Sequence, residues 1–64
     1  MKMDTVQDAV DNRQTDDIIV VVFQNWEEKI LYDSRKTWAD VPLALADYPV
    51  ETIHIVDGLT IVEI

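Results

Sequence analysis

A chain of 64 residues without cysteine has room for a single domain, and it must fold without disulfides or thiolate metal sites. Thirteen acidic residues against five basic ones give a formal net charge of −8, which repels nucleic acid and anionic membranes and favours basic partners. The 48% hydrophobic content excludes a wholly disordered acidic tail, and no apolar segment is long enough to span a bilayer.

The N-terminal segment, residues 1–17, is polar and contains one short helical pattern. Three apolar residues have the spacing of one helical face: Val6, Ala9 and Val10. This spacing predicts a short helix, with Asp4 or Thr5 as its N-cap. The alternative is that the segment is a mobile tail, as is common at chain termini.

Residues 18–23 give the strongest strand signal, because all six are apolar and most are β-branched. A run without polar alternation is typical of a strand that is covered on both faces, so we expect it at the centre of the sheet. Residues 29–33 predict the returning strand of a hairpin. A four-residue loop would set two strand pairs on one face: Phe23 with Ile30, and Val21 with Tyr32.

A helix is expected next, over about residues 38–47. Its apolar stripe has spacings of three, four and three residues: Trp38, Val41, Leu45 and Tyr48. Either Thr37 caps this helix in a box closed by Asp40, or Asp40 is itself the cap, which leaves Pro42 in the tolerated first turn. Pro49 ends the helix. The stripe would pack on the sheet, with its tryptophan in the core.

Two alternating runs around Asp57-Gly58 predict a second hairpin, with strands at residues 50–56 and 59–64. A two-residue turn fixes the register, and the more apolar side pairs Ile55 with Thr60 and Ile53 with Val62. The other side pairs Val56 with Leu59, His54 with Ile61, and Thr52 with Glu63. We expect the first of these sides to meet the helix.

Together these elements predict an α+β fold: a four-stranded, mainly antiparallel sheet of two hairpins, with one helix packed on one face. The single α+β domain would span residues 18–64, with residues 1–17 as a separate N-terminal segment. The opposite sheet face would expose apolar residues inside an acidic frame, which is typical of an interface. Alternatively, residues 1–17 fold back and cover that face.

The residue inventory argues against catalysis. The one histidine, His54, lies within a predicted strand, where a half-buried structural role is commoner than a pH-sensitive contact. One histidine and no cysteine do not make an ordinary zinc site, and the single glycine, Gly58, excludes a glycine-rich phosphate loop and a calcium loop. We therefore expect a protein that is not an enzyme and that uses no cofactor or metal.

Candidate partner-binding residues are acids and one tryptophan around the first hairpin, with two acids on the expected helix: Asp16, Asp17, Trp26, Glu27, Glu28, Asp33, Asp40 and Asp47. Trp26 lies between polar neighbours at the loop, where it either anchors an interface or folds over its own hairpin. The cluster of Lys29, Arg35 and Lys36 is expected to pair with Asp33 and Asp40 instead of binding phosphate.

The sequence raises three classes of function. The first is a non-catalytic inhibitor that acts as a nucleic-acid mimic, whose carboxylates replace phosphates on a basic, nucleic-acid-handling protein. The second is an adaptor or assembly module that homodimerises or binds a partner through a sheet edge or the uncovered sheet face. The third, a small enzyme or metal protein, is nearly excluded by the inventory. We expect a cytoplasmic protein that binds a basic protein and contacts neither nucleic acid nor membrane.

The order of elements resembles that of small acidic phage-encoded inhibitors of host machinery, such as anti-CRISPR proteins and inhibitors of bacterial RNA polymerase. The shared pieces are the hairpin at residues 18–33, the segment at residues 37–42 and the closing strands from Val50. The resemblance implies a phage protein that inhibits a host complex, and it assigns no functional residue.

Overall fold

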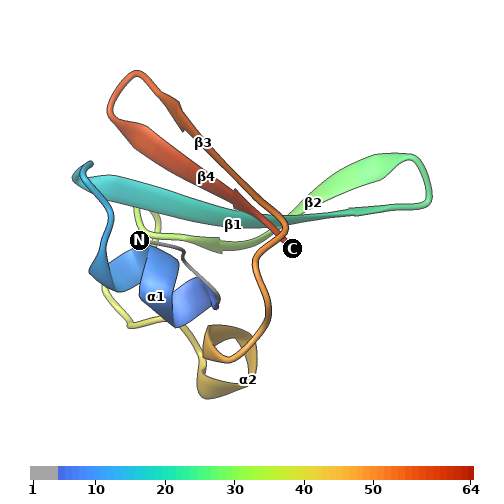
Figure 1. The fold of residues 1–64 in the computed structure, drawn as a ribbon, viewed down its shortest axis with the longest axis horizontal. Coiled ribbons are helices and arrows are strands. Elements are labelled where there is room, and N and C mark those ends of the chain that lie inside the picture. Colours follow the sequence, from blue (N-terminus) through green and yellow to red (C-terminus); the bar gives the residue numbers. More distant parts are fainter. Residues whose placement is uncertain (1–4) are drawn as a thin grey trace.

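The computed structural model describes residues 5–64, in which four strands and two short helices form two layers (Figure 1). The strands are β1 (Asp17–Gln24), β2 (Glu27–Asp33), β3 (Thr52–Val56) and β4 (Leu59–Glu63). The helices are α1 (Val6–Asp11) and α2 (Leu43–Ala46). Both helices lie on the same side of the sheet (Figure 1), and the α+β class predicted from the sequence is confirmed.

The sheet is mixed, with the strand order β2-β1-β4-β3. The pairs β1–β2 and β3–β4 are antiparallel as predicted, whereas β1 and β4 run parallel. The parallel pair joins the two hairpins at the centre and places Ile18 beside Thr60 and Val20 beside Val62. The run at residues 18–21 is buried, which confirms the predicted central position of this strand.

The first hairpin differs in register from the prediction. Its turn has two residues, Asn25 and Trp26, both with left-handed backbone geometry at φ values of 52° and 65°. An extra residue in β2, Leu31, then shifts the pairing by one position. The observed pairs are Phe23 with Glu28, Val21 with Ile30, and Val20 with Tyr32. The four-residue loop was wrong because no glycine in the sequence marks this tight turn.

The second hairpin has the predicted register, because Asp57-Gly58 forms the expected two-residue turn. Its φ values of 49° and 77° are left-handed, the geometry that Asp-Gly sequences favour. The side of β4 that carries Thr60 and Val62 is buried toward the helices, which confirms the predicted orientation of the hairpin.

The helix predicted over residues 38–47 is wrong in length, because α2 contains only four residues. Pro42 is its N-cap, with an extended ψ of 142°, so both predicted caps, Thr37 and Asp40, lie outside the helix. The Thr37 hydroxyl instead accepts a hydrogen bond from the backbone N–H of Ala39 at 3.1 Å. Trp38 is consequently fully exposed and not part of the core.

Helix α1 covers the sheet face that the helix predicted over residues 38–47 was expected to cover. The Thr5 hydroxyl accepts from the Asp8 backbone N–H at 3.2 Å, and the Asp8 carboxylate accepts from the Thr5 N–H at 3.3 Å. This capping box confirms the short helix and one of its two predicted caps. The buried core joins both helices to the sheet and consists of Val6, Ala9, Ile18, Val20, Val41, Ala46 and Val62.

The other face of the sheet has no helix over it within residues 5–64 (Figure 1). Helix α1 lies on the same side as α2, so the described part of the N-terminal segment does not fold back over this face. No helix in the described part of the chain is long and apolar enough to cross a membrane.

If α1 belongs to the cooperative core, truncating its buried side chain destabilises the whole domain. We expect Val6→Ala to lower the free energy of unfolding by about 2 kcal/mol, from lost burial and a small cavity. The exposed neighbour provides the control, because Gln7→Ala should change that energy by less than about 0.5 kcal/mol. Urea denaturation followed by circular dichroism measures both. Equal stability of the two variants would contradict the placement of α1.

Candidate partner-binding surface

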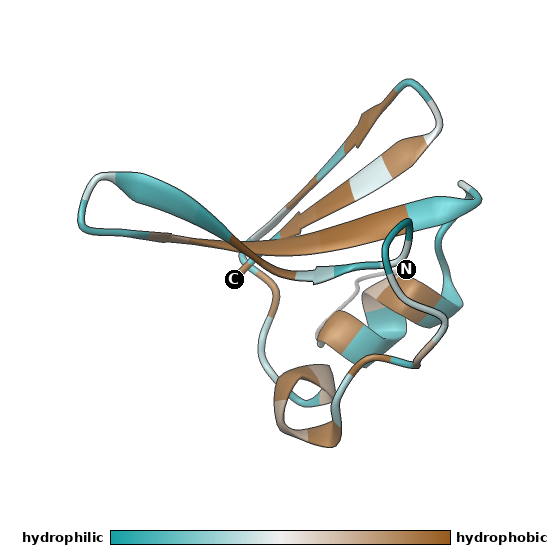
Figure 2. Cartoon of the chain, turned by 180° about the vertical axis from the view of Figure 1, so that it is seen from behind, coloured by the Kyte–Doolittle hydropathy of each residue, from teal (hydrophilic) through white to brown (hydrophobic). Residues whose placement is uncertain are grey.

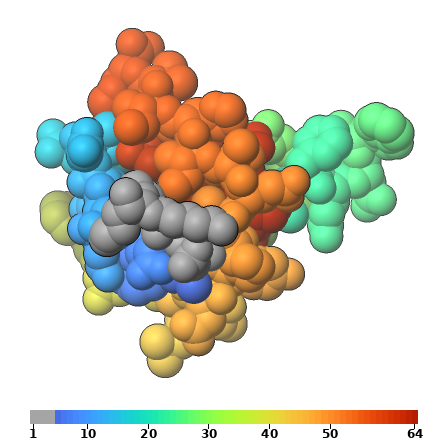
Figure 3. Space-filling view, viewed as in Figure 1, coloured from blue at the N-terminus to red at the C-terminus, as the bar shows by residue number. Residues whose placement is uncertain are grey.

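The outer half of the β1–β2 hairpin projects beyond the rest of the molecule (Figure 3). Strand β4 pairs with β1 only as far as Val21, so residues 22–30, here called the hairpin tip, pair only with each other and with Val21. Side-chain burial along β1 decreases where the pairing with β4 ends: Val21 is buried and Phe23 is exposed. The start of β2 is hydrophilic, whereas β1 stays apolar well into the hairpin (Figure 2). The tip therefore presents both an apolar and an acidic side to solvent.

Two aromatic rings stand beside two carboxylates on this tip. Trp26 is 91% exposed and Phe23 is 61% exposed. Their ring centroids are 6.5 Å apart with perpendicular planes, an edge-to-face contact. Glu27 and Glu28 follow directly and are also exposed. Trp26 thus touches its own hairpin through Phe23, yet nearly all of its surface remains available to a partner.

The backbone at Trp26 is unfavourable for that residue. A side chain with a Cβ atom costs roughly 1 kcal/mol or more in left-handed geometry, whereas asparagine and glycine adopt it readily. Asn25 therefore suits the first position of the turn, and glycine is the usual residue at the second. Trp26 occupies this second position with a φ of 65°. Local turn chemistry does not explain the tryptophan.

Asp33 differs from the other predicted contacts because it is buried, with 6% of its surface exposed. Arg35 donates to it from Nε at 2.9 Å, from Nη2 at 2.9 Å and from its backbone N–H at 3.0 Å. The side-chain hydrogen bonds from Arg35 lower the pKa of Asp33 from 3.8 to about 2. This pairing was expected from the sequence, and it leaves the Asp33 carboxylate unavailable to a partner.

The remaining predicted contacts do not converge on the tip. Asp16 and Asp17 lie at the opposite end of β1, roughly 25 Å away by the rise of an eight-residue strand. Asp17 accepts a hydrogen bond from the Ser34 hydroxyl at 3.2 Å. Asp40 and Asp47 are exposed on the helical side. The prediction that both lie on the helix is wrong, because Asp40 precedes α2 and Asp47 is its C-cap.

Most carboxylates in residues 5–64 have no cationic partner. Within residues 5–64 the only ion pair is Asp33–Arg35, at 2.9 Å. The expected pairing of Asp40 with the basic cluster is absent from this part of the chain. The same range contains no group of three histidine, cysteine or acidic side chains that could hold a metal ion. The exposed carboxylates are therefore free to accept hydrogen bonds from outside.

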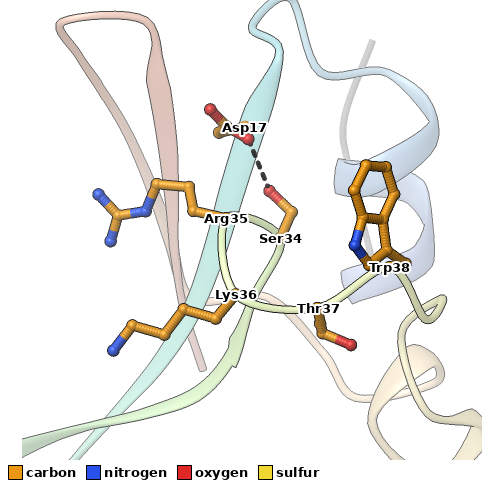
Figure 4. Close-up of a pocket in the computed structure, with 6 residues that line it drawn as sticks. All are labelled: Asp17, Ser34, Arg35, Lys36, Thr37 and Trp38. Atoms are coloured by element: carbon orange, nitrogen blue, oxygen red, sulfur yellow. Dashed lines mark hydrogen bonds between the residues drawn. The ribbon is translucent and has the colours of Figure 1, made fainter.

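An open hollow of about 460 Å³ lies beside the start of β1, next to the loop that follows β2. In Figure 4, Arg35 and Lys36 extend to one side of this loop and Trp38 to the other, with Ser34 bonded to Asp17 between them. These side chains do not meet at a common point, so the hollow assembles no chemical site.

Sequence reasoning missed the exposure of Phe23 and Trp38, because it placed both in packed elements. Asn25, two positions after the apolar run, was the available signal for a tight turn at the tip. No protein-family model, curated protein or solved structure matches this chain.

The Asp33–Arg35 pair gives a pH-dependent contribution to stability. Because folding lowers the pKa of Asp33 from 3.8 to about 2, the contribution is complete above pH 4 and is lost as the pH falls through about 2. We expect Asp33→Asn to be less stable than wild type at pH 7, with the difference shrinking between pH 4 and pH 2. Urea denaturation at several pH values measures it. A difference independent of pH would contradict this assignment.

The left-handed turn predicts an unusual order of stabilities at Trp26. Both Trp26→Gly and Trp26→Ala remove the indole, but only glycine relieves the backbone cost. We therefore expect the glycine variant to be more stable than the alanine variant by about 1 kcal/mol. Thermal and chemical denaturation would measure the difference. Equal stabilities would show that this position does not hold a left-handed geometry in solution.

Proposed function

We propose that the protein is a non-catalytic inhibitor that binds a basic, nucleic-acid-handling protein through the hairpin tip. The observation that carries the proposal is the exposed Trp26 beside the unpaired carboxylates of Glu27 and Glu28, on a hairpin that projects from the domain. Tryptophan is one of the residues enriched at the energetic centres of protein interfaces.

The chemistry of the tip suits lysine and arginine. Free carboxylates accept short, charge-assisted hydrogen bonds from guanidinium and ammonium groups, as phosphates do. The indole face of Trp26 adds a surface on which a guanidinium stacks. Basic proteins that handle nucleic acid carry such cations where phosphates bind. The tip would occupy these cations and compete with nucleic acid.

The turn geometry supports a role in binding for Trp26. Its side chain is 91% exposed and its backbone is left-handed, so the residue contributes little burial and costs local stability. Backbone strain that is retained at an exposed residue is typical of functional sites. A partner pocket that receives the indole would explain why tryptophan occupies a position that favours glycine.

The charge of the whole chain supports the same proposal. A net charge of −8 on 64 residues attracts a cationic surface over several ångströms and speeds association at low salt. The layout that resembles phage-encoded inhibitors of host machinery agrees with an inhibitory role. We place its action in the cytoplasm, since a chain without cysteine suits a reducing compartment.

The test uses two double variants with the same change in net charge. The protein captures its partner from host lysate, and binding to the purified partner is then measured at low and moderate salt. We expect Glu27→Lys with Glu28→Lys to weaken binding at least about tenfold, because two attractive contacts become repulsive. We expect wild-type binding to weaken as salt rises and added nucleic acid to displace the protein.

The matched control, Asp40→Lys with Asp47→Lys, places the same charges on the helical side, away from the tip. At moderate salt, which screens the long-range attraction due to net charge, we expect this control to bind within about threefold of wild type. Equal losses in both double variants would show that net charge, and not the tip, drives binding. Wild-type affinity of the tip variant would remove the hairpin from the interface.

A further inference from the structure

Strand β3 forms an open edge of the sheet. It pairs with β4 on one side, and no other strand in residues 5–64 lies on its outer side. Because the Asp57-Gly58 turn has two residues, Val56 and Leu59 form a hydrogen-bonded pair, and these pairs alternate along an antiparallel ladder. The backbone N–H and C=O groups of Ile53 and Ile55 therefore point away from β4, at the outer edge.

The two edges of the sheet differ in how they discourage further pairing. At the β2 edge, Glu27, Glu28 and Lys29 place charges on the strand, and the extra residue Leu31 disrupts its regularity. Strand β3 has neither feature: it reads Thr-Ile-His-Ile-Val, without a proline, lysine or acid, and its pairing with β4 is regular. It is the edge that an added strand would extend.

An unfilled hollow lies beside this edge, on the helical side of the sheet. Its volume is about 140 Å³. Its apolar lining is Ala9 of α1 with Ile53 and Ile55 of β3, and its polar lining is Asn12, Arg13, Gln14 and Thr60. Ile55 remains 60% exposed there, because α1 ends before it covers the edge. A side chain from a neighbouring strand would enter this space and bury the two isoleucines.

We propose that the β3 edge binds an extended segment of the basic partner as an antiparallel fifth strand. Two acids flank the edge: Glu51 precedes β3 and Asp57 follows it, and both are exposed. A segment with lysine or arginine six positions apart brings a cation near each acid. Apolar residues two positions inside each cation would face Ile53 and Ile55 and fill the hollow.

The same acids disfavour a second copy of this chain as the occupant. Symmetric antiparallel pairing of two β3 strands about His54 would bring Glu51 near Asp57 of the second copy, twice. Like charges directly across a strand pair are destabilising, and each copy already carries a net charge of −8. The choice of a basic occupant rests on the proposed function, whereas the open edge and the hollow do not.

The probe is a synthetic seven-residue peptide with lysine at both ends, isoleucine at the third and fifth positions, and threonine elsewhere. In the antiparallel register its isoleucines face Ile55 and Ile53. Fluorescence anisotropy measures its binding to the full chain. We expect a peptide with glutamate at both ends to bind at least about tenfold more weakly, because both end charges become repulsive.

The protein variant Ile55→Pro tests the backbone contact. Its N–H points outward, so proline removes a donor to the added strand and leaves the bonds between β3 and β4 in place. We expect a loss of about tenfold or more in peptide binding, while Ile55→Val, which keeps the donor, binds within about threefold of wild type. Circular dichroism confirms that both variants are folded.

A second measurement leaves the protein unchanged. N-methylation of the peptide at its third and fifth residues removes the donors that face β3, and we expect it to abolish binding. N-methylation at the second and sixth residues, whose N–H groups point away, should leave binding intact. Equal binding of the two methylated peptides would overturn the proposal.

Two further outcomes separate this inference from the proposed function. In the first, the double variant Glu27→Lys with Glu28→Lys no longer binds the partner, and the wild-type protein does not bind the peptide. The inhibitor proposal then stands and the strand-addition proposal fails. If sedimentation shows a wild-type dimer that Ile55→Pro converts to a monomer, the occupant is a second copy and the basic segment is wrong.

Discussion

Strand β1 holds the molecule together, because it joins its own hairpin to the second one through β4 and packs against the helical layer. Its antiparallel neighbour is β2 and its parallel neighbour is β4, so it is hydrogen-bonded along both sides. Ile18 and Val20 face the helices and pack with Val6 of α1 and Val62 of β4. A domain of this size buries little surface, so its stability depends on these few side chains.

The position of this core determines which parts of the molecule stay free. The packed region lies over the first half of β1, and the second half continues into the projecting tip. The helices are six and four residues long, and they leave the outer edge of β3 uncovered. A net charge of −8 opposes compaction, yet only Asp33 is neutralised by an ion pair within residues 5–64. Most of the other carboxylates in this range are exposed to solvent.

The sequence predicted those features whose chemistry is local. Asp57-Gly58 specified the second hairpin and its register, and the β-branched run specified the buried strand. Two predictions failed because of single residues. The apolar stripe predicted a longer helix, but α2 begins only after Pro42 and has four residues. The two-residue turn was missed because Trp26 occupies the position where glycine is usual. The acidic tip was foreseen from composition, but the burial of Asp33 depends on the turn that brings Arg35 back onto it. The parallel β1–β4 pair, which sets the sheet edges, is a long-range contact that no local pattern reports.

The tip and the β3 edge offer two different kinds of recognition. Carboxylates act at a distance and select for positive charge with little regard to geometry, whereas a strand edge requires backbone contact in one register. The two surfaces lie at opposite edges and opposite ends of the sheet, because Ile55 is level with Ile18 of β1 through Thr60, and Ile18 is roughly 25 Å from the tip by the rise of the strand. A partner cleft that accommodates the domain would reach both at once. Charge would then bring the proteins together, and the strand contact would slow their separation, because backbone hydrogen bonds and buried apolar area are little affected by salt.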